Sequence, residues 1–524
     1  MKPILSGRHL SVAAVLVTAS LVTAACSSSA PVTVTNPAAP KPLASGSWPY
    51  SNGDLSNTRN AAGSTITSAN VSALRQAWTF RITGPAAAGV GSVGALAANP
   101  IVVSGLVYIQ DLDANVYALS LATGRLKWEY QLNTPMKTGP GPDGVAVAGG
   151  MVYGISPTSV FALNASTGKT IWADRHLLGQ GQGTFEIQPQ VAGGRVYLAS
   201  AYGSGPGGGV LLALSAASGE LLWSFNTLLG PDAGVQATGI GSGGAWETPL
   251  VSSDGSVTFG IGNPYQSAAS AIAHPSAQLY TDSDVNLDAA TGKLRWYYQG
   301  VPDDFMDHDM QASPISASVN GIPVVLGGGK MGYVYEMNAQ TGKLIWKTPV
   351  GEHNGHDNDS LLALEHKITL KVPVTIVPGS YGGILTDMAA AGASVYVVTI
   401  DVPVTYTTLK LPVAVTAAGP LGGEVEALNL ATGKVEWDTK VPDLPVGAAT
   451  VSNDLVFTTL YHGVLIALNR STGAIVFRRQ LSTSANAPIA IAGNTVIIPA
   501  GGPATGKDSG SGKPQVVAYT VPVK

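Results

Sequence analysis

The sequence predicts an all-β protein, an eight-bladed β-propeller, and three observations support this prediction. Gly (64) and Pro (34) are abundant among the 524 residues, which favours many short strands joined by tight turns. One strand–turn–strand phrase recurs along the chain. Each copy ends in an aromatic residue, and most copies are roughly 40–50 residues apart, as blades of a propeller are. The eight aromatic markers are Trp78, Trp128, Trp172, Trp223, Trp296, Trp346, Trp437 and Phe477.

The first segment, residues 1–25, has the features of an export signal. Lys2 and Arg8 give it a positive start, and the apolar stretch Leu10–Val22 is too short to span a membrane. An ordinary secretory signal is one interpretation. The small residues of "VTAAC" also resemble a lipoprotein cleavage site, so we expect cleavage before Cys26, lipidation of Cys26 and an exported, cell-envelope lipoprotein held to the membrane only by its lipid.

The next segment, residues 26–47, is rich in Ser, Ala and Pro and is expected to be a flexible tether. Residues 48–524 are expected to form a single propeller domain. Cys26 is the only cysteine, so this domain has no internal disulfide. The chain has 32 acidic and 28 basic residues and no basic cluster, which argues against a nucleic-acid partner. Nothing indicates an oligomer, and we expect a monomer.

Each repeated phrase is predicted to be a hairpin of two strands. Examples are "YALSLATGRLKW", which ends at Trp128, and "EALNLATGKVEW", which ends at Trp437; the Gly of the turn can adopt positive φ. A further strand pair, such as "NPIVVSGLVYIQ", usually precedes the phrase, which gives four strands per unit. One such sheet cannot bury both faces alone, so the units are expected to stack around an axis. Trp78 is interpreted as the end of a unit whose turn is degenerate.

Two insertions interrupt the spacing, between Trp223 and Trp296 and between Trp346 and Trp437. Loops inserted into a rigid scaffold commonly carry binding sites. The first insertion holds Trp246 in "GSGGAWETPL" and Asn263 in "FGIGNPY", and "PDDFMDHDM" follows it. Each of these has a plain alternative: a packed indole, a turn asparagine and a solvated acidic loop.

The phrase A-x-D/N-x-x-T-G-K-x-x-W resembles the tryptophan-docking repeat of the quinoprotein superfamily, whose dehydrogenases use pyrroloquinoline quinone (PQQ). The resemblance runs from about Trp48 to the C-terminus, and "WPYSNGDLSNTRN" is similar to that family's opening segment. It implies an eight-bladed propeller. Related propellers without a cofactor, including scaffolds for outer-membrane barrel assembly, have the same repeat, so the repeat alone does not fix the function.

The run "AWE…GIGNPY…WYYQGVPDDFMDHDM" resembles, in order and approximate spacing, the active-site run of PQQ-dependent alcohol dehydrogenases. The resemblance implies that Trp246 stacks under the quinone, that Asn263 is a metal ligand, and that Asp307 is the catalytic base and a metal ligand. Asp309 resembles the additional anionic ligand of the lanthanide-using branch. Lys330, in "LGGGKMGYVYEMN", falls where the family places a cation against the quinone oxygens, with an exposed surface lysine as the alternative.

These assignments are chemically consistent. Amide and carboxylate oxygens suit a hard cation, either Ca²⁺ or a lanthanide. A carboxylate can take the proton of an alcohol while hydride leaves for the quinone. In an extended segment Asp307 and Asp309 would face the same way and His308 would turn aside. The expected function is therefore oxidation of an alcohol or polyol. A separate electron acceptor is expected because the chain has no C-x-x-C-H haem motif.

Some family features are missing, which favours the alternative of a non-catalytic propeller acting as a cell-envelope binding or assembly scaffold. The segment in which the family has a metal-binding Glu reads "LASAYGSGPGGGVLLAL" and contains no carboxylate; Glu247 is a possible substitute. Adjacent cysteines are also absent. The second insertion holds "GEHNGHDND" (Glu352–Asp359), whose two histidines could bind a transition metal in a helix, with a polar surface loop as the favoured interpretation.

Overall fold

Each copy of the repeated phrase forms an antiparallel hairpin, as predicted. In the first complete blade, β4 (Val116–Ser120) pairs with β5 (Leu126–Tyr130) across the turn of Gly124, whose φ is +66°. β3 (Leu106–Gln110) and β2 (Ile101–Val103) complete the sheet, with β2 innermost. The computed structural model describes residues 46–82, 94–135, 141–201, 208–228, 243–273, 278–408, 415–417, 422–502 and 513–522.

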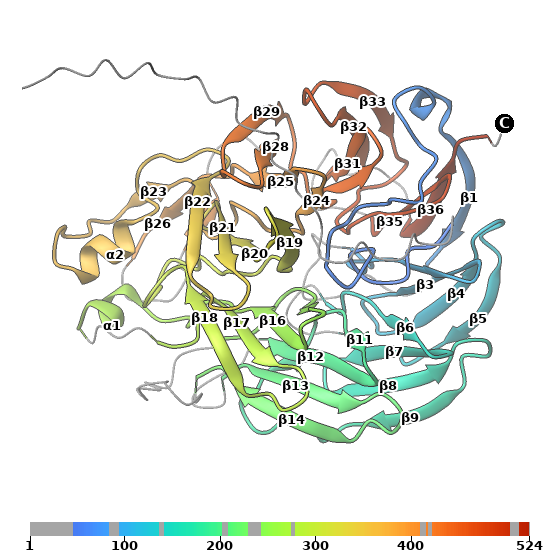
Figure 1. The fold of residues 1–524 in the computed structure, drawn as a ribbon, viewed down its shortest axis with the longest axis horizontal. Coiled ribbons are helices and arrows are strands. Elements are labelled where there is room, and N and C mark those ends of the chain that lie inside the picture. The colour runs from blue at the N-terminus through green and yellow to red at the C-terminus, as the bar shows by residue number, and fades with distance from the viewer. Residues whose placement is uncertain are drawn as a thin grey trace, which may run out of the picture. The chain divides into compact units, whose positions relative to one another are not determined.

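Eight such sheets surround one axis, which confirms the predicted eight-bladed propeller (Figure 1). The second blade consists of β6 (Ala146–Ala148), β7 (Met151–Ser156), β8 (Ser159–Asn164) and β9 (Thr170–Asp174), and the third of β11 (Gln190–Ala192), β12 (Arg195–Ala201), β13 (Val210–Ser215) and β14 (Leu221–Asn226), with the short β10 (Thr184–Phe185) on β12. The fourth blade consists of β15 (Leu250–Val251), β16 (Ser256–Gly260), β17 (Ser283–Asp288) and β18 (Leu294–Gln299), and the fifth of β19 (Ile315–Val319), β20 (Ile322–Gly329), β21 (Tyr333–Asn338) and β22 (Leu344–Pro349). The sixth blade consists of β24 (Ala389–Ala391), β25 (Ser394–Ile400), β28 (Gly423–Asn429) and β29 (Val435–Val441), and the seventh of β30 (Thr450–Ser452), β31 (Leu455–Leu460), β32 (Val464–Asn469) and β33 (Ile475–Gln480).

The last blade joins the two ends of the propeller sequence. β1 (Arg75–Arg81), which follows the 3₁₀ turn η1 (Val71–Ala73), pairs antiparallel with β36 (Gln515–Thr520). β35 (Thr495–Ala500) and the innermost β34 (Ala490–Ala492) complete that sheet, and β34 contacts β2 of the first blade, so the ring is closed. The interpretation of Trp78 as the end of a further unit is confirmed, because β1 is the outermost strand of this sheet, but the expected degenerate turn before it was wrong. Its partner strand comes from the far end of the chain, with no hairpin before it.

The aromatic markers hold neighbouring blades together. Trp128 Nε1 donates a hydrogen bond to the carbonyl of Ala165 in the next blade at 2.9 Å. All seven marker tryptophans donate to a carbonyl in this way. Gly168 has φ +68° and lies against the indole, since a Cβ there would be 2.6 Å from Trp128 Cε3. The repeated glycine therefore serves both the turn and the docking of the preceding blade.

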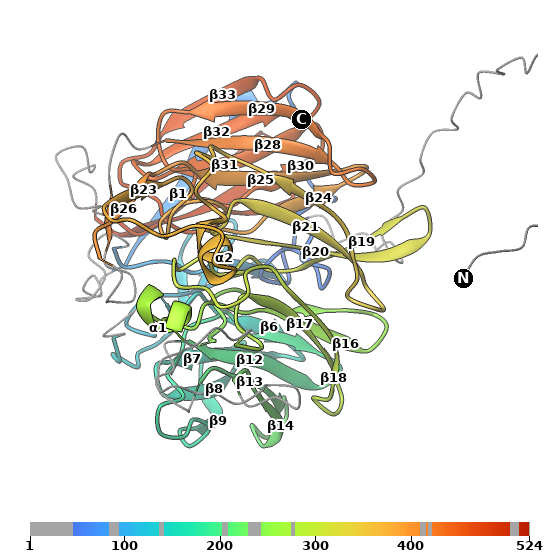
Figure 2. The ribbon, with the colours of Figure 1, turned by 90° about the vertical axis from the view of Figure 1, so that its left-hand side faces the viewer.

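The two insertions pack on one another at one side of the ring. They contain α1 (Ala268–Ala273) and α2 (Asp359–Leu364). A small sheet of β23 (Val374–Ile376), β26 (Val404–Tyr406) and β27 (Val415–Ala417) lies beside them. α1, α2, β23 and β26 share one hydrophobic cluster with Phe305 and Met306 of the aspartate-rich segment. Figures 1 and 2 show the two helices close together beyond the blade edges. The insertions thus anchor the segment that carries Asp307 and Asp309.

The described residues all belong to one compact unit, Thr33–Lys524. In this described part, no helix combines the length and the apolar character needed to cross a membrane. The predicted signal (residues 1–25), the predicted lipidation site Cys26 and all but the last two residues of the predicted tether lie outside the described residues. These assignments remain predictions.

Candidate functional site at the propeller axis

A cavity of about 480 Å³ lies at the axis of the ring. All eight blades contribute to its lining, mostly through residues a few positions before an innermost strand. Such residues face the axis because the innermost strands surround it. Six site residues were predicted, including Cys26 and Asn263. The other four line this cavity: Trp246, Asp307, Asp309 and Lys330.

Lys330 lies between the two candidate carboxylates. Its Nζ is 3.0 Å from Asp307 Oδ1 and 2.6 Å from Asp309 Oδ2. Burial alone would lower the pKa of Lys330, but the two carboxylates outweigh burial and raise it well above its usual value, so Lys330 is an ammonium ion. Burial is also the main reason why the pKa of Asp307 is raised, although Lys330 opposes that effect. The alternative of an exposed surface lysine does not describe this residue, since its side chain is 12 % exposed.

Asn263 contacts both carboxylates although it does not itself line the cavity. Its backbone N–H donates to Asp309 Oδ1 at 2.6 Å, and its Nδ2 donates to the same oxygen at 2.7 Å. Nδ2 also donates to Asp307 Oδ1. The side-chain oxygen of Asn263 accepts a hydrogen bond from the backbone N–H of Tyr265 at 2.6 Å. The structure thus brings together residues 44 and 46 positions apart in the sequence.

Trp246 lies close to Asp309, with Gly262 in contact with both side chains. A Cβ on Gly262 would be 2.5 Å from Trp246 Nε1 and 2.7 Å from Asp309 Oδ1, so only glycine leaves room for both. Trp246 is half-buried and exposes part of its indole to the cavity. The three groups on which the predicted site depends, at residues 246, 263 and 307, therefore lie around one point.

Glycines in β20 explain how the strand can approach the aspartate segment so closely. A Cβ on Gly329 would lie 1.8 Å from the carbonyl oxygen of Asp309, and the backbone N–H of Lys330 donates to that oxygen at 2.9 Å. The "LGGGK" sequence therefore holds Lys330 and Asp309 against each other through the backbone as well as through the ion pair.

The four aspartates of "PDDFMDHDM" divide into two pairs with different roles. Asp304 accepts hydrogen bonds from the backbone N–H groups of Met306 and His308 at 2.8 and 2.9 Å, and so stabilises a turn. Asp303 accepts a hydrogen bond from the side chain of Gln266. Only Asp307 and Asp309 face the cavity.

The expectation that Asp307 sits in an extended segment was wrong. Asp307 has φ +63°, in the left-handed region that aspartate tolerates better than most residues. The local chain forms turns and no strand. His308 is fully buried and turned away from the cavity, toward Asp304 at 3.7 Å. The two carboxylates still converge, because backbone turns and β20 hold them there.

The second insertion does not assemble a histidine site. His353 pairs with Asp357 at 3.2 Å, and His356 pairs with Asp359 at 2.9 Å. Glu352 pairs with a lysine at the surface. The two imidazoles thus have different carboxylate partners in a loop that precedes α2, which agrees with the favoured interpretation of a polar loop.

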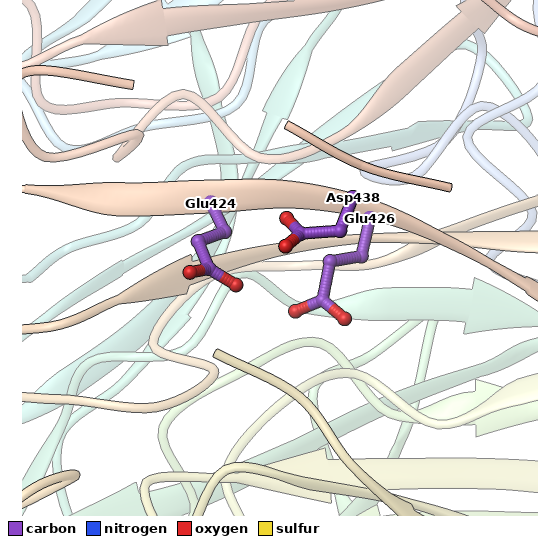
Figure 3. Close-up of side chains that lie close together, drawn as sticks. All are labelled: Glu424, Glu426 and Asp438. Carbon is purple, nitrogen blue, oxygen red and sulfur yellow. The ribbon is translucent and has the colours of Figure 1, made fainter. Parts of the chain in front are cut away.

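A separate carboxylate group, Glu424, Glu426 and Asp438, lies on β28 and β29, with side-chain oxygens within 4.8 Å of one another (Figure 3). The protein already supplies partners to it. Lys440 Nζ is 3.1 Å from Glu424 Oε1, and the backbone N–H of Gly351 donates to Glu426 Oε1 at 2.6 Å. Burial is the main cause that raises the pKa of Glu424 to about 7 and that of Glu426 to about 8. This group affects stability and does not qualify as a metal centre.

Three carboxyl groups line the cavity beside Trp246, and sequence reasoning missed two of them, Asp143 and Glu186. Asp143, Glu186 and Glu247 precede the innermost strands β6, β11 and β15 of three consecutive blades. The available signal was an acidic residue three or four positions before an innermost strand, in three successive repeats. Glu247 was considered as a substitute for a missing metal ligand, and it does reach the cavity. Residues 202–207 of the segment expected to hold that ligand lie outside the described residues.

Comparison with known proteins adds a family assignment. Residues 48–147 and 180–355 match the family described as "Glucose/ethanol/alcohol dehydrogenase, beta-propeller domain", and residues 421–519 match the one described as "Outer membrane protein assembly factor BamB". The chain is 27% identical to the quinohemoprotein alcohol dehydrogenase of Comamonas testosteroni over 374 residues, which cover 64% of this chain and 51% of that one. It is 25% identical to the quinoprotein alcohol dehydrogenase PedH of Pseudomonas putida over 478 residues, 78% of each chain. The chain thus spans about half the length of the Comamonas relative.

Solved structures share the fold. The Comamonas testosteroni enzyme superposes with a TM-score of 0.75 at 22% identity, over 91% of this chain and 81% of that one. A europium-containing methanol dehydrogenase gives the same TM-score at 21% identity, over 91% and 98% of the two chains. BamB from Moraxella catarrhalis gives 0.51 at 14% identity, over 85% and 97%. At these identities the likeness establishes the propeller alone.

Proposed function

Because this chain belongs to the glucose/ethanol/alcohol dehydrogenase β-propeller family, we propose that it is a quinoprotein dehydrogenase that oxidises an alcohol or a polyol. The proposed cofactors are PQQ and a hard metal ion, either Ca²⁺ or a lanthanide. A separate carrier is proposed to accept the electrons. The observation that carries the proposal is the convergence of Asn263, Asp307, Asp309 and Lys330 beside Trp246 at the axial cavity.

The residues present fit a hard cation. Asn263 now points Nδ2 toward the two carboxylates. Rotation of this amide by half a turn would present Oδ1 in its place, so that Asn263, Asp307 and Asp309 would all offer oxygen atoms. Hard cations prefer such all-oxygen donor sets. The ammonium group of Lys330 already shows that two carboxylates buried at this point attract positive charge.

The cavity also fits a planar quinone. Its volume of about 480 Å³ is within the usual range for cofactor pockets. The half-buried indole of Trp246 offers a flat apolar surface in its lining, on which an aromatic ring system can stack. Lys330 lines the same cavity and can place a positive charge beside a quinone oxygen.

When bound, PQQ would supply the hydride acceptor, and the cation would polarise its carbonyl. The chain's own part is to bind the alcohol and to take its hydroxyl proton, which we assign to the carboxylate of Asp307. Lys330 holds that carboxylate in place through its Oδ1 atom. Because Asp307 is 6 % exposed, bulk water has little access to the group that would hold the proton.

We also propose that the protein is exported and anchored through a lipid on Cys26, with the propeller held away from the membrane by the segment up to residue 47. The charge and hydropathy pattern of residues 1–25 supports this proposal. An anchored location suits an enzyme that must pass electrons to a separate carrier.

A second candidate function is a non-catalytic scaffold of the cell envelope. It is favoured by the match of residues 421–519 to the BamB family, which covers blades that contribute no predicted site residue. The two functions differ in one measurable property, since only the dehydrogenase needs a quinone.

Spectroscopic titration separates them. Purified protein is incubated with PQQ and either Ca²⁺ or La³⁺, and the absorbance of bound quinone is followed after removal of the free quinone. We expect binding with one of the ions and dye-linked oxidation of an alcohol. Asp307→Ala should keep the fold, judged by circular dichroism, and lose turnover. If no quinone binds with either ion, the scaffold becomes the better assignment.

A further inference from the structure

The cavity has a second group of acids besides Asp307 and Asp309. Asp143, Glu186 and Glu247 line it from three consecutive blades, and we name these three residues the acid wall. Asp307 and Asp309 have Lys330 between them, whereas no ion pair within 4.0 Å connects the acid wall to a cation among the described residues. The acid wall therefore has a chemical character of its own.

Glu186 is the most informative member of the acid wall. Its side chain is 1 % exposed, and within the described residues neither of its carboxyl oxygens makes a hydrogen bond. It nevertheless lines the cavity. A buried polar group without a partner costs free energy, so two such oxygens at the wall of a cavity indicate that a bound molecule supplies the partners.

The nearest cation acting on the acid wall is committed elsewhere. Arg59 is fully buried, and its charge acts on Glu247. Its Nε and both Nη atoms donate to neutral acceptors: the side chains of Asn52, Asn99 and Thr450 and the carbonyls of Ala449 and Ile489. All five N–H groups are thus used, and none is donated to the acid wall.

The surroundings of the acid wall disfavour its ionised form. Burial, and then the charge of Asp143, raise the pKa of Glu186 well above its usual value. Burial and Asp387 do the same for Asp143 and Glu247. The other charged groups that face the cavity or act on the wall are Arg59, Asp387, Asp307, Asp309 and Lys330. A protonated carboxyl group differs from a carboxylate in one decisive respect, because it can donate an O–H hydrogen bond.

The charges of the proposed cofactors favour this protonated form. Among the described residues, Asp307 and Asp309 form ion pairs with Lys330 alone, so they leave no positive charge free for a further anion. PQQ is a tricarboxylic acid, so a trivalent ion would balance its three carboxylates and a divalent ion would leave one negative charge. An ionised acid wall would add three more negative charges to a buried cavity, which is electrostatically costly. Carboxyl groups that donate to the ligand's carboxylates form strong, charge-assisted hydrogen bonds instead.

We propose that Asp143 and Glu186 bind the carboxylates of the quinone by donating hydrogen bonds from protonated carboxyl groups, so that cofactor binding is coupled to proton retention. The proposal rests on the proposed function, since it assumes that the quinone occupies the cavity. A cation would be the usual partner for an anionic ligand at this position. Protonated carboxyl groups take its place in the proposal, so the affinity for PQQ depends on pH.

The sign of this dependence follows from linkage. While the free acid wall is protonated, the affinity is independent of its titration. Above the pKa of the free wall, each proton that binding must take up lowers the affinity about tenfold per pH unit. The dissociation constant for PQQ should therefore rise as the pH increases through the pKa of the free acid wall.

The experiment is a titration of the full chain with PQQ at saturating La³⁺ or Ca²⁺, from pH 5.5 to 9, followed by quenching of tryptophan fluorescence and checked by equilibrium dialysis. The wild-type affinity should stay constant while the acid wall is protonated and should fall by about tenfold per pH unit once the wall ionises. Glu186→Gln keeps a hydrogen-bond donor that cannot ionise, and it should flatten this dependence. The matched control, Glu426→Gln, removes a buried carboxyl with a raised pKa away from the cavity and should leave the dependence unchanged.

The outcomes are distinguishable. Equal affinity of the wild type and of Glu186→Ala, which has no donor, for PQQ at pH 5.5 would overturn the inference and leave the proposed function standing. The acid wall would instead be a cation site if the affinity for PQQ increased with pH and the wild type bound a second equivalent of La³⁺ or Ca²⁺ that Glu186→Gln does not bind. That result would also overturn the inference. Absence of PQQ binding at every pH with either ion would overturn both. The wild-type titration needs no variant to fold.

Discussion

Replacement of Lys330 by methionine tests the electrostatics of the site without any quinone. Lys330 Nζ is 3.0 and 2.6 Å from carboxylate oxygens of Asp307 and Asp309, whose side chains are buried. Methionine keeps much of the volume and removes the charge. Loss of one partner from a buried ion pair costs roughly 3–5 kcal/mol, because the remaining charge is left uncompensated. We expect Lys330→Met to lower the free energy of unfolding in chelator by about that amount.

A hard cation should then restore part of the loss. An ion at a hundredfold excess over its dissociation constant stabilises the folded state by about 2.7 kcal/mol. Chemical denaturation of Lys330→Met with chelator and with La³⁺ or Ca²⁺ measures both quantities. Lys440→Met is the control, because Lys440 is 65 % exposed; such a pair contributes less than about 1 kcal/mol, with no dependence on the ion. If Lys330→Met unfolds like the wild type under both conditions, the carboxylates do not form the buried charge cluster on which the metal assignment depends.

Three further predictions concern stability and location. Burial raises the pKa of Glu426 to about 8, so the unfolded chain loses this proton at a lower pH than the folded protein. The free energy of unfolding should therefore fall by up to roughly 5 kcal/mol as the pH rises from about 4.5 to about 8. Urea denaturation at several pH values should show that Glu426→Gln removes this loss. Gly168→Ala should destabilise the protein by roughly 2–5 kcal/mol, because the alanine would have to adopt positive φ and its Cβ would lie 2.6 Å from the Trp128 indole. Gly105 is the control, because it has φ +74° and open space where a Cβ would be. Gly105→Ala should therefore show only the cost of positive φ, roughly 1–2 kcal/mol. Cys26→Ser should move the protein from the membrane fraction to the soluble exported fraction, and detergent partitioning would detect a lipid on the wild type only.

The propeller was predictable from sequence because its stabilising contacts repeat. Seven tryptophans donate to a carbonyl of a neighbouring blade, and each needs the same glycine beside the same indole position, so the requirement appears seven times in the sequence. The closing blade was not predictable in the same way. β36 does not carry the phrase, and its pairing with β1 joins residues more than 400 positions apart.

The site was predictable only where its residues resemble a known order of motifs. Asp307 and Asp309 could not be separated from Asp303 and Asp304 by residue type. The backbone conformation determines which of these carboxyl groups face the cavity. Asp307 has φ +63°, whereas Asp304 accepts hydrogen bonds from the local backbone, so the two side chains point in different directions. Glu186 was invisible to motif reasoning, because a single acid before a short strand is informative only once the ring brings it to the axis.

The two groups of carboxyls in the cavity meet opposite electrostatic requirements, and this difference links the metal assignment to the acid wall. Asp307 and Asp309 share one cation, Lys330, which contacts both carboxyl groups, and this is the arrangement expected of anionic ligands for a metal ion. Within the part of the chain that the structure describes, the Glu186 carboxyl group has no such cation and no hydrogen bond, and burial raises its pKa well above the usual value. A ligand that fills the cavity must therefore offer a cation at one end and hydrogen-bond acceptors at the other. A metal-bound quinone that carries carboxylates has both, whereas a simple polyol brings no cation to Asp307 and Asp309, and a bare cation brings no acceptor for a hydrogen bond from Glu186.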